Sequence, residues 1–220
     1  MRRDILTACI AMVVFTVLLG LVYPLVITGV SQVAFPGNAN GQKVYVGGKL
    51  VGSKIIGQSF AKVVLDKNGK PKEEEGELLT QADPRYFQSR PSATEGGAYN
   101  AAASAFSNRG PNDKATEEAD AENIKAYLAL EKPYDPSLTT AQIPVDAVNT
   151  SASNLDPEIS EANARIQAHR VAAKRGLSLS EVDGLVSKYT DARGLGFSGE
   201  PGVNVLELNL ALDRLTAAPR

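Results

Sequence analysis

The sequence has very little of the side-chain chemistry on which metal and redox sites depend. Its 220 residues include one cysteine, Cys9, and one histidine, His169. Cys9 lies in the apolar N-terminal run, so the rest of the chain can hold neither a disulfide framework nor a thiolate metal site. No pair of carboxylates and no cluster of histidine and aspartate stands out. We therefore expect no metal, no cofactor and no catalytic residue of the chain's own.

An excess of positive charge is also missing. The formal net charge is −2, which gives no overall basic field to hold nucleic acid. The sequence therefore argues against a nucleic-acid partner.

Charged residues are absent from residue 5 to residue 42. As a helix, the run 5–30 would be about 39 Å long, against a hydrocarbon core of about 30 Å. It can cross a membrane with tilt, or end early near Ile27. A cleaved secretory signal would have an apolar region of roughly 7–15 residues before a small-residue cleavage site. This run is longer, and Gln32 stands where a small residue is needed, so we expect a retained transmembrane anchor.

The charges around this run predict its orientation. Arg2 and Arg3 precede it, and the next positive charge is Lys43. The positive-inside rule then places the N-terminus in the cytoplasm, and long domains translocate largely regardless of their own charge. The predicted organisation is a cytoplasmic N-terminus and single transmembrane helix over 1–34, followed by one mixed α/β extracytoplasmic domain over 35–220.

The apolar run carries small or helix-perturbing residues at every fourth position, among them Thr16, Gly20, Pro24 and Thr28. Thr16 and Gly20 form a small-x-x-x-small pair, which lets a second helix approach closely. Small residues, glycine and proline are also common in membrane spans generally. A packing face for a partner helix and ordinary span composition both remain open.

Turn residues divide the first part of the outer domain. Residues 36–38 have the composition of a short link, and 43–46 and 49–58 are predicted to form two strands around a Gly-Gly turn. The segment 66–77 is predicted to be a charged surface loop with a turn at Asn68-Gly69. A helix is expected from about Thr116 to Glu131, before Pro133 stops it.

Capping residues mark the expected helix ends in the second part of the outer domain. One helix is expected after Asp156 or Ser160 as N-cap, and Gly176 follows its last turn. Ser178 and Glu181 form a capping box that opens a second helix, through about Thr190. The final apolar segment has leucine at 206, 208, 210 and 212. This period of two predicts a half-buried strand.

Three short patterns could carry chemistry. Residues 47–54 have glycines at the spacing of a phosphate-binding loop, but Ser-Lys stands where that loop needs Lys followed by Ser or Thr. Ser59 and Lys62 fit the S-x-x-K pattern of serine acyl enzymes, whose Ser-x-Asn and Lys-Thr-Gly companions do not occur here. His169 would need a nucleophile and an orienting carboxylate. A membrane-anchored extracytoplasmic serine hydrolase using Ser59 and Lys62 is therefore the alternative function.

The stretch 86–100, YFQSRPSATEGGAYN, follows no helix or strand period. Arg90 precedes Pro91, which restricts its backbone to extended conformations and so aims its side chain. We interpret the stretch as a structured loop that either braces the domain or docks on a partner. The residues expected to do so are Tyr86, Phe87, Arg90, Pro91, Ser92, Tyr99 and Asn100.

Several blocks, in chain order, carry a family resemblance: GSKIIGQSF, YFQSRPSA, SNRGPN, IPVD, SNLDPEIS and GEPGVNVLELNLALD. With the single N-terminal span, they strongly resemble the C subunits of bacterial Kdp-type potassium-transporting ATPases, over essentially the whole chain. Asn154 and Glu158 stand where that family tends to have glycine and histidine.

The resemblance implies a partner complex in the bacterial inner membrane. It implies a channel-like subunit that carries potassium, a P-type ATPase subunit that hydrolyses ATP, and a very small membrane subunit. The C subunit is expected to support assembly and to raise the nucleotide affinity of the ATPase subunit, while the partners handle ATP and potassium. ATP is cytoplasmic, so an outer domain would act on it only by biasing a two-state pump.

Overall fold

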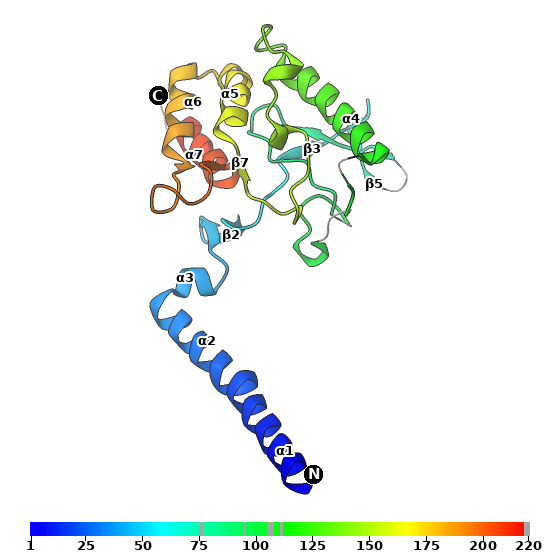
Figure 1. The fold of residues 1–220 in the computed structure, drawn as a ribbon. Coiled ribbons are helices and arrows are strands. Elements are labelled where there is room, and N and C mark those ends of the chain that lie inside the picture. The colour runs from blue at the N-terminus through cyan, green and yellow to red at the C-terminus, as the bar shows by residue number, and fades with distance from the viewer. Residues whose placement is uncertain (75–76, 95, 105–107, 111, 218–220) are drawn as a thin grey trace. The chain divides into compact units, whose positions relative to one another are not determined.

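The computed structural model describes residues 1–74, 77–94, 96–104, 108–110 and 112–217. The chain divides into two compact units, Met1–Ser53 and Lys54–Arg220 (Figure 1). The expected boundary at 34/35 falls inside the first of these units.

The first unit begins with a continuous helix. It consists of α1 (Arg2–Val17), a π-helical turn η1 (Leu18–Val22) and α2 (Tyr23–Ala34). Together they form a helix of 33 residues that is long and apolar enough to cross a membrane. The π turn comes directly before Pro24, and the Tyr23 N–H donates to the Leu18 carbonyl five residues back. Proline has no N–H and its ring crowds the preceding turn, which accounts for the widened turn at this place.

A short helix and a hairpin complete the first unit. Residues 36–38, predicted to be a link, instead form the single helical turn α3 (Pro36–Ala39), which proline can open because its fixed φ suits the first helical position. The antiparallel strands β1 (Lys43–Val46) and β2 (Lys49–Ser53) confirm the predicted hairpin. Gly47 and Gly48 have φ of 57° and 79°, as a tight hairpin turn requires. The second strand ends at Ser53, not at residue 58 as expected.

Short strands open the second unit. β3 (Ala61–Val63) pairs antiparallel with β6 (Thr80–Ala82), and β4 (Glu73–Glu74) pairs with β5 (Glu77–Leu78). The prediction of a simple loop over 66–77 is therefore wrong in part, because this segment includes β4 and the first residue of β5. The turn at Asn68-Gly69 is present, and Gly69 has φ of 77°. Residues 75 and 76 lie outside the described residues.

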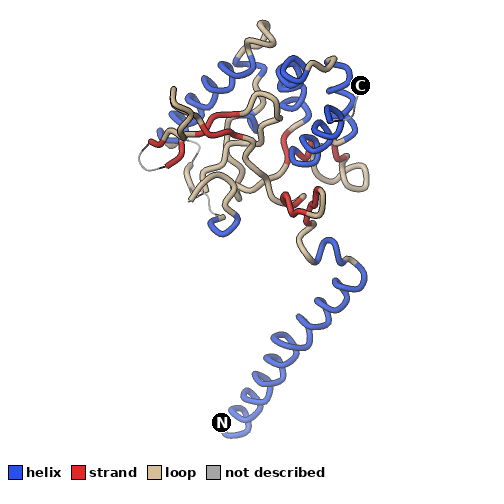
Figure 2. The backbone as a smooth tube through the Cα atoms, turned by 180° about the vertical axis from the view of Figure 1, so that it is seen from behind, coloured by secondary structure: helices blue, strands red, loops and turns tan. Residues whose placement is uncertain are grey.

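The remainder of the second unit is mainly helical, with long loops (Figure 2). Its antiparallel sheet has the order β7-β9-β8, with β7 (Glu158–Ile159), β8 (Thr190–Asp191) and β9 (Gly202–Asn204). The helices are α4 (Lys114–Glu131), α5 (Glu161–Arg175), α6 (Leu179–Lys188) and α7 (Val205–Ala217). Single 3₁₀ turns are η2 (Ala101–Ala103), η3 (Thr140–Gln142) and η4 (Val145–Ala147).

The predicted caps of α5 and α6 are confirmed. The Ser160 hydroxyl accepts the N–H of Asn163 at the start of α5, and Gly176 ends this helix in the left-handed conformation. Asp156 is thus not the cap. Ser178 and Glu181 form the reciprocal capping box of α6. These contacts are local, so the residue types at fixed spacing were sufficient to find them.

The predicted C-terminal strand is wrong. Only residues 202–204 form a strand, and α7 covers the alternating leucines. Leu208 and Leu212 are both fully buried and lie four residues apart, so the same leucines also satisfy a helical period. The Asn204 side chain accepts the Glu207 N–H at 3.1 Å, which caps the first turn.

The main core of the second unit lies between α5, α6, α7 and the β7-β9-β8 sheet. Phe87 from the 86–100 loop is fully buried in it, beside Val171 of α5, Val186 of α6 and Leu208 of α7. A smaller cluster holds Tyr127 of α4 with Leu138 and Val148. The 86–100 loop therefore contributes to the core itself.

Candidate functional site: a loop clamped over a buried arginine

Two side-chain amides hold the start of the 86–100 loop. The Asn209 amide of α7 accepts the Phe87 N–H and donates to the Phe87 carbonyl, both at 2.9 Å. The Gln167 amide of α5 accepts the Gln88 N–H at 2.7 Å and donates to the Gln88 carbonyl at 3.1 Å. Each amide thus makes the pair of hydrogen bonds that the backbone of a neighbouring strand would otherwise make. Two successive residues of the loop are clamped between α5 and α7.

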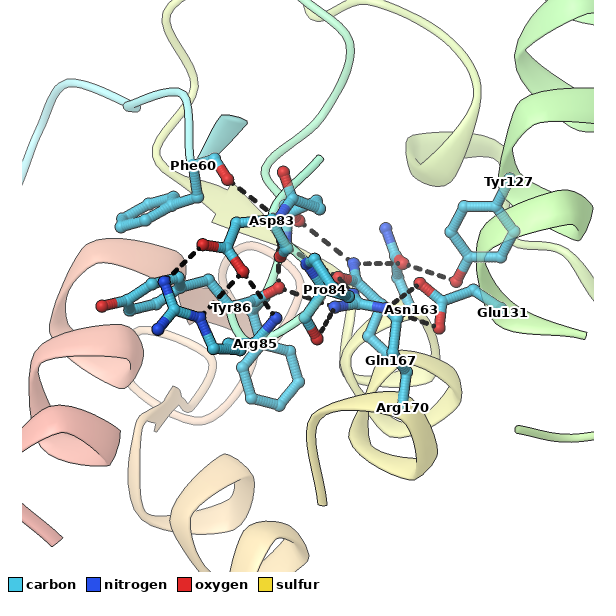
Figure 3. Close-up of polar contacts among 12 residues, drawn as sticks. Phe60, Asp83, Pro84, Arg85, Tyr86, Tyr127, Glu131, Asn163, Gln167 and Arg170 are labelled. Atoms are coloured by element: carbon cyan, nitrogen blue, oxygen red, sulfur yellow. Dashed lines mark hydrogen bonds and ion pairs between the residues drawn. The ribbon is translucent and has the colours of Figure 1, made fainter. Parts of the chain in front are cut away.

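Arg170 lies beneath this clamp with its side chain fully buried. Its Nη1 donates to the carbonyls of Pro84 and Tyr86 at 2.7 and 2.9 Å, and its Nη2 donates to Gln167 at 2.9 Å. Figure 3 shows the guanidinium between the 84–86 turn and Glu131. Every nitrogen of the guanidinium has a partner, as the planar fork of arginine allows.

Glu131 supplies the counter-charge. It is the last residue of α4 and is 1% exposed, and both its carboxylate oxygens accept from Arg170 Nε, at 2.9 and 3.1 Å. Burial raises the pKa of the Glu131 carboxyl, and the Arg170 guanidinium opposes that rise. Since arginine stays protonated in proteins, losing either partner would leave an unpaired buried charge. The pair joins α4 to α5.

The network continues along α5 to Asn163. Its side-chain oxygen accepts from the Tyr127 hydroxyl and from the Gln167 amide, each at 2.9 Å. Its amide nitrogen donates to Asp146 at 2.9 Å. Burial is the main cause that raises the pKa of the Tyr127 hydroxyl, which therefore remains a neutral donor. These bonds fix α4, α5 and η4 to one another.

A compact turn precedes the clamp. The Asp83 carboxylate accepts the Arg85 N–H at 3.0 Å and both Arg85 Nε and Nη2, at 3.1 and 2.8 Å. The Arg85 hydrogen bond, opposed by burial, lowers the pKa of Asp83 to about 2, and the charge of Lys62 contributes. The turn presents the Pro84 and Tyr86 carbonyls to Arg170.

We expect Asp83→Asn to lower the free energy of unfolding at pH 7 by about 1 kcal/mol, because a charged hydrogen bond is lost beside a largely exposed arginine. The folded pKa of Asp83 lies below its unfolded value, so its stabilisation is present above about pH 4 and is lost as the pH falls through about 2. Chemical unfolding of wild type and variant at several pH values measures the difference. A difference that persists unchanged at pH 2 would contradict this assignment.

Arg90 bonds to three residues of the 149–156 segment. Its Nη1 lies 3.2 Å from Asp156, and its Nη2 donates to Asn149 at 2.9 Å and to the Thr150 carbonyl at 3.2 Å. Its Nε is buried without a partner. The side chain is thus directed at the 149–156 segment.

The rest of the loop folds back on itself and on the same segment. The Tyr99 hydroxyl donates to the Arg90 carbonyl at 2.5 Å, and the Tyr99 N–H donates to Ser92 at 3.0 Å. The Ser92 hydroxyl donates to the Asn154 carbonyl at 2.8 Å. Asn154 has φ of 58°, a conformation that glycine and asparagine adopt readily. Asn100 caps η2, and Glu95 lies outside the described residues.

We expect Arg90→Lys to lower the melting temperature of the chain by several degrees, because lysine keeps the charge and loses the fork that reaches Asp156, Asn149 and Thr150 together. Thermal unfolding of the purified chain tests the bracing role, and recovery of the assembled pump tests a docking role. Normal melting with failed assembly would favour docking. Wild-type values of both would show that Arg90 neither braces the loop nor docks on a partner.

Sequence reasoning missed the residues beneath the loop: Glu131, Asn163, Gln167, Arg170 and Asn209. A signal was present on α5, where the polar residues 163, 167 and 170 follow the spacing i, i+4, i+7 of a buried face. They lie beside Ala164, Ala168 and Val171, all fully buried. Polar residues at core spacing indicate a satisfied buried network.

The candidates for catalysis are not brought together. The Ser59 hydroxyl accepts the Ala61 N–H, and Lys62 is an exposed residue of β3 paired across from Gln81. Among the described residues no hydrogen bond joins Ser59 to Lys62, and none joins His169 to a nucleophile or a carboxylate. The described residues also contain no group of three or more side chains that could hold a metal ion.

The expected helix-packing face is exposed along the Arg2–Ala34 helix. Thr16, Gly20, Pro24 and Thr28 all lie on its surface. A Cβ added at Gly20 would meet no atom within 4 Å.

Comparison with known proteins identifies the family. A family model described as the c chain of the K⁺-transporting ATPase, KdpC, matches residues 5–214. The chain belongs to the KdpC family. The resemblance found in the sequence is thereby confirmed, and the chain is a subunit of a potassium-transporting ATPase.

Curated members of the KdpC family match over nearly their whole length. A potassium-transporting ATPase KdpC subunit of Mycobacterium bovis is 45% identical over 215 residues, which cover 98% of this chain and 100% of the relative. That of Methylococcus capsulatus is 45% identical over 208 residues, 94% of this chain and 96% of the relative. That of Koribacter versatilis is 41% identical over 219 residues, 100% of this chain and 98% of the relative.

Proposed function

We propose that this chain is a non-catalytic subunit that supports assembly of the potassium pump and raises the apparent nucleotide affinity of its ATPase subunit. The observation that carries the proposal is the full-length match to KdpC subunits. The buried polar groups around Arg170 support it, because they form hydrogen bonds with one another and with the backbone. The partners are a channel-like subunit, a P-type ATPase subunit and a very small membrane subunit, and they handle ATP and potassium.

The proposed topology is a single pass through the bacterial inner membrane, with the N-terminus in the cytoplasm. Arg2 and Arg3 favour this orientation, and the Arg2–Ala34 helix has the length and composition of a span. The large second unit then lies on the side without ATP. A change in nucleotide affinity must therefore arise by coupling, in which the chain binds one state of the pump more tightly and shifts its population.

The membrane helix offers a surface for one of the partners. The exposed face of Thr16, Gly20, Pro24 and Thr28 fits close contact with a neighbouring span, because small residues let two helix backbones approach. Contact within the membrane would link this chain to the part of the pump that changes conformation.

A pump from which this chain is removed after assembly should show the effect on nucleotide affinity directly. We expect the ATP concentration for half-maximal potassium-dependent ATPase activity to rise about tenfold, the lower part of the range typical of coupling between sites. Adding back the wild-type chain should restore the lower value. The double variant Ser59→Ala/Lys62→Ala should restore it equally well, because neither side chain has a catalytic role in this proposal.

Two outcomes would contradict the proposal. An unchanged ATP dependence with and without the chain would remove the nucleotide effect. Loss of activity by several orders of magnitude in an assembled pump carrying Ser59→Ala/Lys62→Ala would favour the hydrolase instead, since such losses follow removal of a catalytic group.

A further inference from the structure

The β1–β2 hairpin is exposed on both of its faces. Tyr45, Val46 and Leu50 are 56%, 43% and 52% exposed. Tyr45 pairs across the strands with Leu50, so the two side chains share one face, while Val46 pairs with Lys49. An isolated two-stranded hairpin is at best marginally stable in water. These apolar side chains therefore need a partner surface.

Hydrogen bonds hold the hairpin next to the end of the membrane-spanning helix. The Asn40 amide donates to Gln32 of α2 at 3.0 Å and to the Pro36 carbonyl at 2.7 Å. The Ser53 hydroxyl, at the end of β2, donates to the Gly41 carbonyl at 2.7 Å. These bonds fix the link between α2 and the hairpin at both of its ends, within the compact unit Met1–Ser53. The hairpin is thus kept close to the surface from which the helix emerges.

The charged residues of the hairpin and of the sequence on either side of it are all positive. No aspartate or glutamate occurs from residue 5 to residue 65, although the whole chain has a net charge of −2. Lys43 and Lys49 are both exposed. In the part of the chain that the structure describes, no ion pair involves either of them. An apolar and aromatic surface with unpaired lysines is complementary to an anionic, partly apolar partner.

We propose that the hairpin lies on the bilayer surface and binds anionic phospholipid. Tyr45 and Leu50 contact the boundary between headgroups and acyl chains, where tyrosine is enriched. Lys43 and Lys49 extend to the lipid phosphates, because lysine can keep its charged end in the headgroup region. The inference rests on the proposed membrane anchoring. It adds a second contact that fixes how the chain leaves the membrane.

The absence of tryptophan from the chain allows a direct test. Tyr45→Trp in the full chain, reconstituted in nanodiscs with and without anionic phospholipid, places a single fluorophore on the hairpin. We expect blue-shifted emission and quenching by spin-labelled lipid when anionic lipid is present. Adding Lys43→Gln and Lys49→Gln should lower the equilibrium constant between the lipid-bound and the free hairpin roughly thirtyfold. This corresponds to about fivefold for each lysine near an anionic surface.

Val145→Trp provides the control, because Val145 lies in the second unit and is 69% exposed. It should emit as a solvent-exposed tryptophan. Emission and acrylamide access at position 45 equal to those at position 145 would overturn the proposal. Protection that appears only in the assembled pump, without lipid quenching, would overturn it in favour of a protein contact. Co-purification of the Tyr45→Trp chain with the pump tests the proposed function independently of lipid binding.

Discussion

Replacing Arg170 by methionine is expected to lower the free energy of unfolding by about 3–5 kcal/mol, the usual cost of breaking a buried ion pair. Methionine fills much of the space but leaves the Glu131 carboxylate buried without its counter-charge. The Pro84 and Tyr86 carbonyls lose their donor as well. Because whole domains are stable by only about 5–15 kcal/mol, we expect little of the variant to survive as folded protein.

A matched control is available on the same helix. Arg165 of α5 pairs with Glu161 one turn away and, at 3.6 Å, with Asp183 of α6, and all three side chains are about a third or more exposed. Arg165→Met should therefore cost no more than about 0.5 kcal/mol. Urea unfolding of the two variants in the full chain compares them. Equal losses would mean that burial of the Arg170 pair is unimportant.

A double variant separates the two parts of the Arg170 effect. Glu131→Gln added to Arg170→Met removes the unpaired charge while the backbone carbonyls still lack their donor. We expect it to recover part of the lost stability, because an uncompensated buried charge costs more than an unsatisfied neutral group.

Local signals account for what the sequence could predict. Ser160, Gly176 and the Ser178–Glu181 pair act on groups within a few residues, and so does the Gly47-Gly48 turn. The long apolar helix could be predicted because a run without charge can be read from composition alone. Such features do not depend on what the rest of the chain does.

The α7 segment shows where a local signal is ambiguous. Leucine at every second position satisfies a strand, and two of those leucines four apart satisfy a helix equally well. The choice depends on the surroundings. Asn209 of α7 must face the loop to hold Phe87, and Leu208 and Leu212 must face the core. Neither the 86–100 loop nor most of the core is near α7 in the sequence.

The Arg170 network could not be predicted for the same reason. Arg170 meets Glu131 across 39 positions and Pro84 across 86. The loop itself was recognised from its composition, but the bonds that order it come from α5, α7 and the 149–156 segment. A single sequence does not reveal such pairings, although polar residues at core spacing on α5 indicate that pairings exist.

Gly57→Ala is expected to destabilise the second unit by about 1–3 kcal/mol, the usual cost of overpacking. Gly57 is buried against the Tyr99 ring, and an added Cβ would clash with that ring and stand 2.6 Å from the Asp156 carbonyl oxygen. The backbone cannot easily recede, because the Gly57 N–H donates to the Leu155 carbonyl at 2.7 Å. Moving Tyr99 instead would break its bond to the Arg90 carbonyl.

Gly184→Ala gives the opposite sign and so controls for the substitution itself. Gly184 lies on the exposed side of α6, and a Cβ there would meet no atom within 4 Å. Alanine should stabilise that helix by roughly 0.5–1 kcal/mol. Thermal unfolding of both variants should therefore shift in opposite directions from wild type. If Gly57→Ala instead unfolds at or above the wild-type temperature, the 86–100 loop is not packed against residues 57 and 156, and the bracing role of Arg90 and Tyr99 falls with it.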